Sequence, residues 1–182
     1  MDQQYFTEEE WTLLREAPTQ VAIAVILADK SDPVMFLQET YAAAQILLEE
    51  EQRALEGVSD LVRAVIESMR EVGAGNATNP GLPNASPTDL KQLEILIKIR
   101  SLESAKKGRQ AAIAHADRAS EVLASKVTIV QAKEFDKWLI NIATRVAESV
   151  KERGFLGLGG EWISEEELSV IRKLKKALEY RE

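Results

Sequence analysis

Residues 14–25 of the chain read LREAPTQVAIAV, and they align without gaps on residues 139–150, which read LINIATRVAESV. Five positions match in step, and each stretch continues through a short non-helical link into a second helical pattern. The links are residues 29–33 and 154–163, and the second patterns are residues 34–51 and 165–179. We therefore expect an internal repeat, with one helix-loop-helix unit used twice in a pseudo-symmetric fold. Two amphipathic helices rich in alanine and valine can also agree by chance.

The composition is that of a folded globular protein. Of the 182 residues, 45% are apolar and 29% are charged. A chain of this length can bury roughly 70% of its unfolded surface, so we interpret residues 1–182 as a single domain. The chain has no cysteine, which excludes disulfides, thiolate catalysis and thiolate metal sites.

Charge and hydropathy restrict the partners and the location. The first ten residues, MDQQYFTEEE, lack the basic and apolar regions of a secretory signal. The longest apolar run, residues 21–28, is well short of the roughly 20 residues that span a bilayer. The net charge of −7 disfavours nucleic acid, since affinity for phosphate backbones depends on clustered lysine and arginine. We expect a cytoplasmic protein that binds neither membrane nor nucleic acid.

Capping patterns and apolar spacing predict helices throughout and no strand. The predicted helix starts lie at or just after Thr7, Asp32, Ser86, Thr128 and Ser164. At these positions a hydroxyl or carboxylate can accept a hydrogen bond from an unpaired N–H of the first turn. Pro18 predicts a kink or break at residues 16–18, because proline removes one donor and clashes with the carbonyl four residues earlier. The sequence therefore predicts an all-α bundle of six or seven helices.

The middle of the chain contains the clearest interruption. Residues 73–87 (GAGNATNPGLPNASP) hold three glycines, three prolines and three asparagines, which predicts an internal loop or linker after a helix over residues 58–72. Beyond this segment, a stripe at Leu90, Leu93, Ile97 and Leu102 predicts the buried face of one long helix. Gly108 is the expected weak point of that helix.

Residues 154–160 (GFLGLGG) form the most prominent local motif. A phosphate-binding loop follows a strand and precedes a helix start without negative charge, whereas here a helical pattern precedes the glycines and several glutamates follow. The apolar side chains beside the glycines either pack under the bundle or bind a partner. The predicted site for a protein partner or a second copy consists of Phe155, Leu156, Leu158 and Trp162.

The other candidate sites have simpler structural interpretations. His115 is the single histidine, and the sequence indicates no nucleophile for it, so we predict no catalytic residue, no enzymatic activity and no cofactor. Asp29, Asp32 and Glu39 could hold a hard cation through their carboxylate oxygens. The EF-hand pattern is not met, because the position that requires glycine is Val34. Asp32 is better explained as a helix cap. The glutamate triplets at 8–10, 49–51 and 165–167 are typical of solvated helix ends. The three tryptophans are predicted to anchor the core, and they are Trp11, Trp138 and Trp162.

Two resemblances follow from these segments. Residues 134–167, EFDKWLINIATRVAESVKERGFLGLGGEWISEEE, resemble a segment of bacterial all-helical proteins of unassigned function, and the likeness covers mainly residues 6–51 and 134–178. Residues 26–39, ILADKSDPVMFLQE, are more distantly similar to TerB-like tellurite-resistance domains. That resemblance implies a link with metal or stress responses. The usual Asp-Gly turn of that family is Asp29-Lys30 here, so no site residue is transferred.

Together these patterns predict a non-enzymatic protein-protein interaction or scaffolding module in a bacterial cytoplasmic assembly or stress pathway. It would bury apolar side chains of a helix face, or of the loop at residues 154–163, against a protein partner or a second copy. The alternative is a bundle that binds a small molecule or a divalent cation through carboxylates. That alternative requires at least three acidic side chains converging inside the core.

Overall fold

The computed structural model describes residues 5–28, 33–76, 85–149 and 163–178. Over these ranges the protein is all-helical, as the sequence predicts, and no described residue belongs to a strand. The helices are α1 (Glu8–Ile26), α2 (Pro33–Gln52), α3 (Asp60–Asn76), α4 (Pro87–Arg100), α5 (Ala105–Lys126), α6 (Ile129–Ser149) and α7 (Glu165–Leu178). No helix within the described ranges combines the length and the apolar character needed to cross a bilayer.

The helices begin where the capping patterns predict. The Thr7 hydroxyl accepts a hydrogen bond from the Glu10 N–H at 3.2 Å, and the Glu10 carboxylate accepts one from the Thr7 N–H at 2.8 Å. Equivalent reciprocal bonds start α4 at Ser86 and α7 at Ser164. Pro18 does not end α1, so the predicted break is absent. Proline removes only one helical donor, and the buried side chains on both sides of Pro18 hold the helix in the core.

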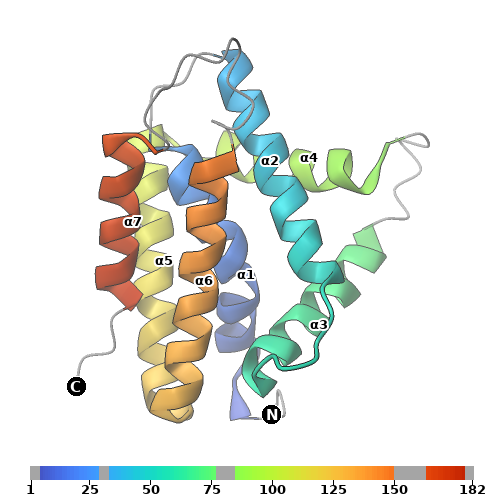
Figure 1. Ribbon diagram of the computed structural model, residues 1–182, viewed down its shortest axis with the longest axis vertical. Helices are drawn as coiled ribbons and strands as arrows, with labels where there is room; N and C mark the ends of the chain where they lie inside the picture. Colours follow the sequence, from blue (N-terminus) through green and yellow to red (C-terminus); the bar gives the residue numbers. More distant parts are fainter. Residues whose placement is uncertain (1–4, 29–32, 77–84, 150–162, 179–182) are drawn as a thin grey trace.

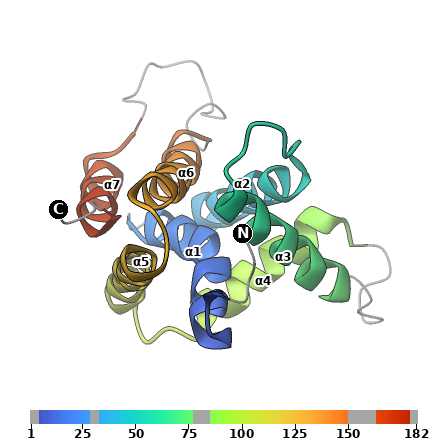
Figure 2. The same ribbon diagram turned by 90° about the horizontal axis from the view of Figure 1, so that it is seen from below.

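Figures 1 and 2 show two groups of helices. In the first group, which we call the bundle, α5, α6 and α7 pack around α1. The second group, which we call the arm, consists of α2, α3 and α4 along one side of the bundle. The arm contacts the bundle mainly where α2 and α3 pack against α6 and α1.

The core lies where α1 meets the rest of the bundle. Its largest fully buried side chains include Leu14, Phe135, Leu139, Ile142 and Leu174. Trp11 and Trp138 are buried anchors as predicted, and the Trp11 indole N–H donates to the Ser68 hydroxyl at 3.1 Å. Trp162 lies outside the described residues.

Residues 14–25 lie in α1 and residues 139–149 lie in α6, and the two helices pack against each other. Val150, the last matched position, lies outside the described residues. Matched positions 14 and 139, 21 and 146, and 22 and 147 are all buried. The helices that follow differ, because α2 has 20 residues and packs on α4 and α6, whereas α7 has 14 and packs on α5 and α6. Since any two core helices share burial of this kind, the internal duplication stays a prediction.

Two predicted boundaries in the middle of the chain are corrected by the structure. Residues 73–76 continue α3 instead of starting a loop, because each helical glycine costs only about 1 kcal/mol relative to alanine. Residues 77–84 lie outside the described residues. The predicted long middle helix is two helices: α4 ends at Arg100, and the Ser104 hydroxyl caps α5 by accepting from the Lys107 N–H at 3.2 Å.

Contrary to the prediction from the sequence, Gly108 does not interrupt a helix but allows close packing of α5. It is buried in α5, and a Cβ atom at this position would fall on the Leu102 side chain and within 2.9 Å of the Leu27 Cδ1 atom. The next residue, Arg109, donates from one guanidinium nitrogen to the carbonyls of Leu27 and Ala28, each at 2.9 Å. The start of α5 therefore packs on the carboxyl end of α1 and satisfies two of its last carbonyl groups.

We expect alanine substitution to have opposite effects at two helical glycines. At Gly108 the added methyl group displaces Leu102 and Leu27, which lowers the free energy of unfolding by about 1–2 kcal/mol despite the better helix propensity of alanine. At Gly73 the nearest atom to the added Cβ would be a Glu51 oxygen at 3.5 Å, an ordinary contact, so stability should rise by up to about 1 kcal/mol. Urea denaturation of both variants measures this, and stabilisation by Gly108→Ala would contradict the close contact.

Candidate functional site

The sequence-predicted site residues fall mostly outside the part of the chain that the structure describes. This holds for Phe155, Leu156, Leu158, Trp162, Asp29 and Asp32. Glu39 is described, lies in α2 and is 9% exposed. Within the described ranges no group of three histidine, aspartate or glutamate side chains is placed to hold a metal ion. The cation-binding alternative therefore gains no support from these residues.

α4 exposes apolar side chains that the sequence predicted to be buried. Ile97 is 60% exposed, Leu93 is 38% exposed and Leu90 is half-buried, whereas Ile95 is completely buried. Their spacing of three and four residues places Leu90, Leu93 and Ile97 on one side of the helix, and we call this surface the α4 face. The predicted burial is wrong for Leu93 and Ile97, because α4 turns its other side, which carries Ile95, toward the protein. Leu102, the last residue of the predicted stripe, is partly buried and packs against the core.

α4 is fastened to α2 through the side opposite the α4 face. The Gln92 amide donates to the Leu37 carbonyl at 3.0 Å and to the Thr40 hydroxyl at 2.9 Å. The Lys91 ammonium lies 2.7 Å from a Glu51 carboxylate oxygen. Burial alone would lower the pKa of Lys91, but the Glu51 and Glu94 carboxylates outweigh it and hold this pKa above its ordinary value. Figure 1 shows α4 crossing α2. Because α4 packs on α2 through its other side, the α4 face points away from α2.

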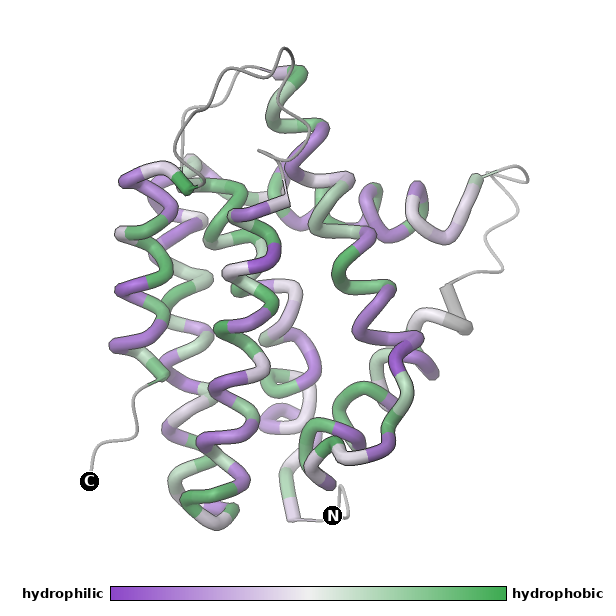
Figure 3. The backbone as a smooth tube through the Cα atoms, in the orientation of Figure 1, coloured by the Kyte–Doolittle hydropathy of each residue, from purple (hydrophilic) through white to green (hydrophobic). Residues whose placement is uncertain are grey.

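Two smaller apolar areas lie at ends of helices. Val34, Met35 and Leu37 are exposed in the first turns of α2, and Ile129 and Val130 are exposed at the start of α6. Figure 3 shows both areas as hydrophobic segments at the projecting end of α2 and at the turn between α5 and α6. Each covers little more than one turn, whereas the α4 face extends over two turns of a well-capped helix.

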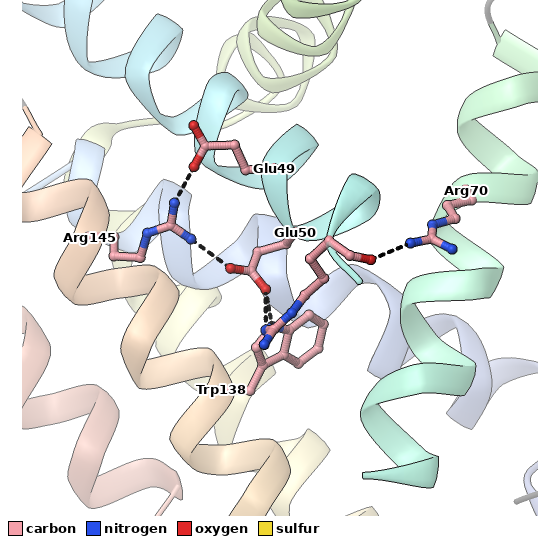
Figure 4. Close-up of polar contacts among 6 residues, drawn as sticks. Glu49, Glu50, Arg70, Trp138 and Arg145 are labelled. Atoms are coloured by element: carbon pink, nitrogen blue, oxygen red, sulfur yellow. Dashed lines mark hydrogen bonds and ion pairs between the residues drawn. The ribbon is translucent and has the colours of Figure 1, made fainter. Parts of the chain in front are cut away.

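A polar cluster at the carboxyl end of α2 attaches the arm to the bundle. Glu50 is buried, and its carboxylate accepts from the Trp138 indole N–H at 2.8 Å and from the Arg145 guanidinium at 2.6 Å, both on α6. Arg145 also bonds the exposed Glu49 through its other terminal nitrogen. We call Glu49, Glu50, Trp138 and Arg145 the clamp, and Figure 4 shows it joining α2 to α6.

The third helix of the arm is tied to the same end of α2. The Arg70 guanidinium of α3 donates to the Arg53 carbonyl at 2.9 Å and to the Glu51 carbonyl, groups at the end of α2 that have no partner within a helix. The triplet at residues 49–51, predicted to be a solvated helix end, is therefore mostly a buried junction. Glu50 is 5% exposed and Glu51 is 7% exposed. The orientation of α2, and with it that of α4, is fixed by ion pairs to α6 and α4 and by hydrogen bonds from α3.

A pocket with a volume of about 320 Å³ lies between α2 and α6 beside the clamp. Its lining consists of Ala42, Gln45, Ile46, Glu49, Arg145, Glu148 and Ser149. The one cation of this lining, Arg145, is already paired with Glu49 and Glu50. The lining offers neither a histidine nor a paired nucleophile and base, so it does not indicate catalysis.

Asp136 and His115 are titratable side chains that are buried inside the bundle and whose pKa values are shifted. Asp136 of α6 is 8% exposed, one of its carboxylate oxygens has no hydrogen-bond partner among the described residues, and burial raises its pKa to about 7. His115 of α5 donates from Nε2 to the Leu13 carbonyl at 2.8 Å, which fixes its tautomer. Burial lowers the pKa of His115, so the neutral ring is favoured. His115 is thus a packing residue, as the lone histidine on an alanine-rich helix indicates.

Comparisons with protein-family models, with curated proteins and with solved structures find no match to this chain. The resemblance to bacterial all-helical proteins and to TerB-like domains stays a prediction. Any functional conclusion therefore depends on the α4 face, the clamp that orients it and the buried groups described above.

Proposed function

We propose that the protein is a non-enzymatic interaction module that binds another protein surface through the α4 face. The observation that carries this proposal is that α4 has large apolar residues on two sides, one with Ile95 and one with Leu93 and Ile97, and that only the first is buried. Its six large apolar residues are Leu90, Leu93, Ile95, Leu96, Ile97 and Ile99. A surface helix normally turns its apolar side toward the core and its polar side toward solvent.

The neighbours of α4 leave room for a partner. α4 packs mainly on α2 and makes a smaller contact with α1, which includes an ion pair of 3.1 Å between Lys98 and Glu16. Soluble monomers rarely expose contiguous apolar surface beyond a few hundred Å², and such surfaces mark interaction sites. A helix or a flat apolar surface laid on the α4 face would bury Leu93 and Ile97 and complete the packing of α4.

The clamp supports this role because it holds the binding helix in one orientation. α4 has one main neighbour, α2, and α2 is fixed to α6 through Glu50 and to α3 through its terminal carbonyl groups. A site that is ordered before binding loses less conformational entropy when the partner arrives. We extend the proposal to a scaffolding role in a bacterial cytoplasmic assembly or stress pathway, in line with the resemblance of residues 26–39.

The proposal predicts that glutamate on the α4 face separates the protein from its partner. In extracts of its native cell that contain the tagged protein at about 100 µM, the wild type should elute from gel filtration well ahead of a 20.2 kDa monomer. The Leu93→Glu/Ile97→Glu variant should elute as the monomer, because two buried carboxylates without counter-ions oppose association. The matched control is Gln110→Glu/Ala114→Glu, which places the same charges with the same spacing on an exposed side of α5.

Far-UV circular dichroism should show the same helicity for the three proteins, since all four substituted positions are exposed. The control should keep the elution volume of the wild type. A wild-type protein that elutes as a monomer in the native extract would overturn the proposal, and so would a Leu93→Glu/Ile97→Glu variant that elutes with the wild type.

A further inference from the structure

We infer that the occupant of the α4 face is a second copy of this chain, with the two α4 helices antiparallel about a two-fold axis. The inference rests on the proposed function of the α4 face and names the partner. A two-fold interface places the same surface on both sides, so that surface must be complementary to itself. The charges that border the α4 face therefore decide whether it can pair with itself.

One border of the α4 face carries two opposite charges, one near each end of the helix. Asp89 lies in the first turn and Arg100 in the last, and both fall on the same border of the α4 face, next to Leu93 on a helical projection. In an antiparallel pair, each Asp89 comes opposite the Arg100 of the other copy, so two ion pairs form by symmetry. A parallel pair would instead place the border that carries Asp89 and Arg100 opposite the other border of the second copy, so neither ion pair could form. Antiparallel alignment also opposes the two helix dipoles.

The charges near the proposed axis have counter-ions within the same chain. Glu94, the residue after Leu93, lies 3.3 Å from the Lys91 ammonium, and Lys98 lies 3.1 Å from Glu16. The two Glu94 side chains of a dimer would therefore approach as neutralised pairs. Hydrogen bonds from the Ser86 hydroxyl and backbone hold the pKa of Asp89 below its usual range, so its carboxylate is charged at neutral pH and available to Arg100 of the second copy.

The apolar residues match in the same alignment. With the axis between Leu93 and Glu94, Leu90 comes opposite Ile97 of the second copy, and the two Leu93 side chains meet near the axis. The 14 residues of α4 extend over about 21 Å. One helix of this length covers less than the roughly 800 Å² per partner of a standard interface, so we expect a dissociation constant on the order of 10 µM.

Single cysteines provide a direct test, because the chain has none of its own. Under mild oxidation of the purified full chain, Leu93→Cys should form a disulfide-linked dimer at least about tenfold faster than Ile97→Cys or Leu90→Cys alone. In the antiparallel alignment the two copies of position 97 are about 10 Å apart along the helix axis, too far for a disulfide. A mixture of Leu90→Cys and Ile97→Cys chains, tagged to different sizes, should form the mixed dimer.

Sedimentation of the unmodified protein between about 1 and 100 µM should show a monomer converting to a dimer, with the Arg100→Glu chain remaining monomeric. Rapid self-linking of all three single-cysteine chains would mean a parallel pair and would overturn the alignment. A wild-type chain that stays monomeric at 100 µM, with no mixed disulfide, would overturn the second copy as occupant. In that case the proposed function would still hold if the early-eluting complex in native extracts depended on Leu93 and Ile97. It would be contradicted as well if native extracts contained no such complex.

Discussion

Replacing Glu50 with alanine lowers the free energy of unfolding by about 3 kcal/mol, whereas the same replacement at Glu49 lowers it by less than about 1 kcal/mol. Both carboxylates bond Arg145, but the Glu50 side chain is 6% exposed and the Glu49 side chain is 64% exposed. Without Glu50, the buried Trp138 indole N–H loses its acceptor, and an unsatisfied buried donor carries the full penalty of desolvation. Without Glu49, Arg145 loses only an exposed partner, which water replaces, so the loss of stability is small.

Guanidinium denaturation of the wild type and the two alanine variants measures this difference. Trp138 fluorescence should change in Glu50→Ala even under native conditions, because the indole loses its charged hydrogen-bond partner. Equal destabilisation by the two substitutions would show that the clamp does not depend on burial. It would also remove the argument that α2, and hence α4, is rigidly held.

Replacing Asp136 with asparagine makes the protein more stable at pH 8, by about 2 kcal/mol, and changes stability little at pH 4. Burial raises the folded-state pKa of Asp136 from 3.8 to about 7. Between these values the unfolded chain has released a proton that the native protein retains, so the wild type loses stability as pH rises. The loss is on the order of 4 kcal/mol across this window and remains above it. Asparagine removes the charge but buries an amide, which offsets part of the gain.

Urea denaturation at intervals from pH 4 to pH 8.5 measures this dependence. The difference in free energy of unfolding between Asp136→Asn and the wild type should grow from about pH 4 to about pH 7 and then level off. Glu134→Gln, an exposed amide substitution on the same helix, serves as the control and should show no such growth. A difference that is the same at every pH would mean that Asp136 is ionised in the folded protein at low pH, against its burial.

Much of the fold could be predicted because its determinants are local. Thr7, Ser86 and Ser164 mark helix starts through hydrogen bonds that span three residues, and these bonds are present. The buried face of α6, including Phe135 and Leu139, follows from helical spacing. The spacing of apolar residues shows which side of a helix is hydrophobic. It therefore predicts the buried residues correctly wherever that side contacts the core.

The α4 face and the clamp could not be predicted because they depend on contacts between distant segments. Spacing shows that α4 has an apolar stripe at Leu93 and Ile97, but not that the helix packs through Ile95 instead. Glu50 looks like one of three surface glutamates, since Trp138 and Arg145 follow it 88 and 95 residues later in the chain. The signal in the sequence for the α4 face was that the six large apolar residues of α4 spread over more than one side of the helix.

The most direct measurement of whether the α4 face is a binding surface is its protection in the native cell. Leu93→Cys and Glu121→Cys place single thiols on the α4 face and on an exposed side of α5. In dilute purified protein, a maleimide reagent should modify both thiols readily. In native cells, we expect modification at position 93 to slow several-fold while modification at position 121 is unchanged, because a partner covers α4. An unchanged ratio of the two rates would show that the α4 face is open to solvent where the protein works, and would contradict its role in binding.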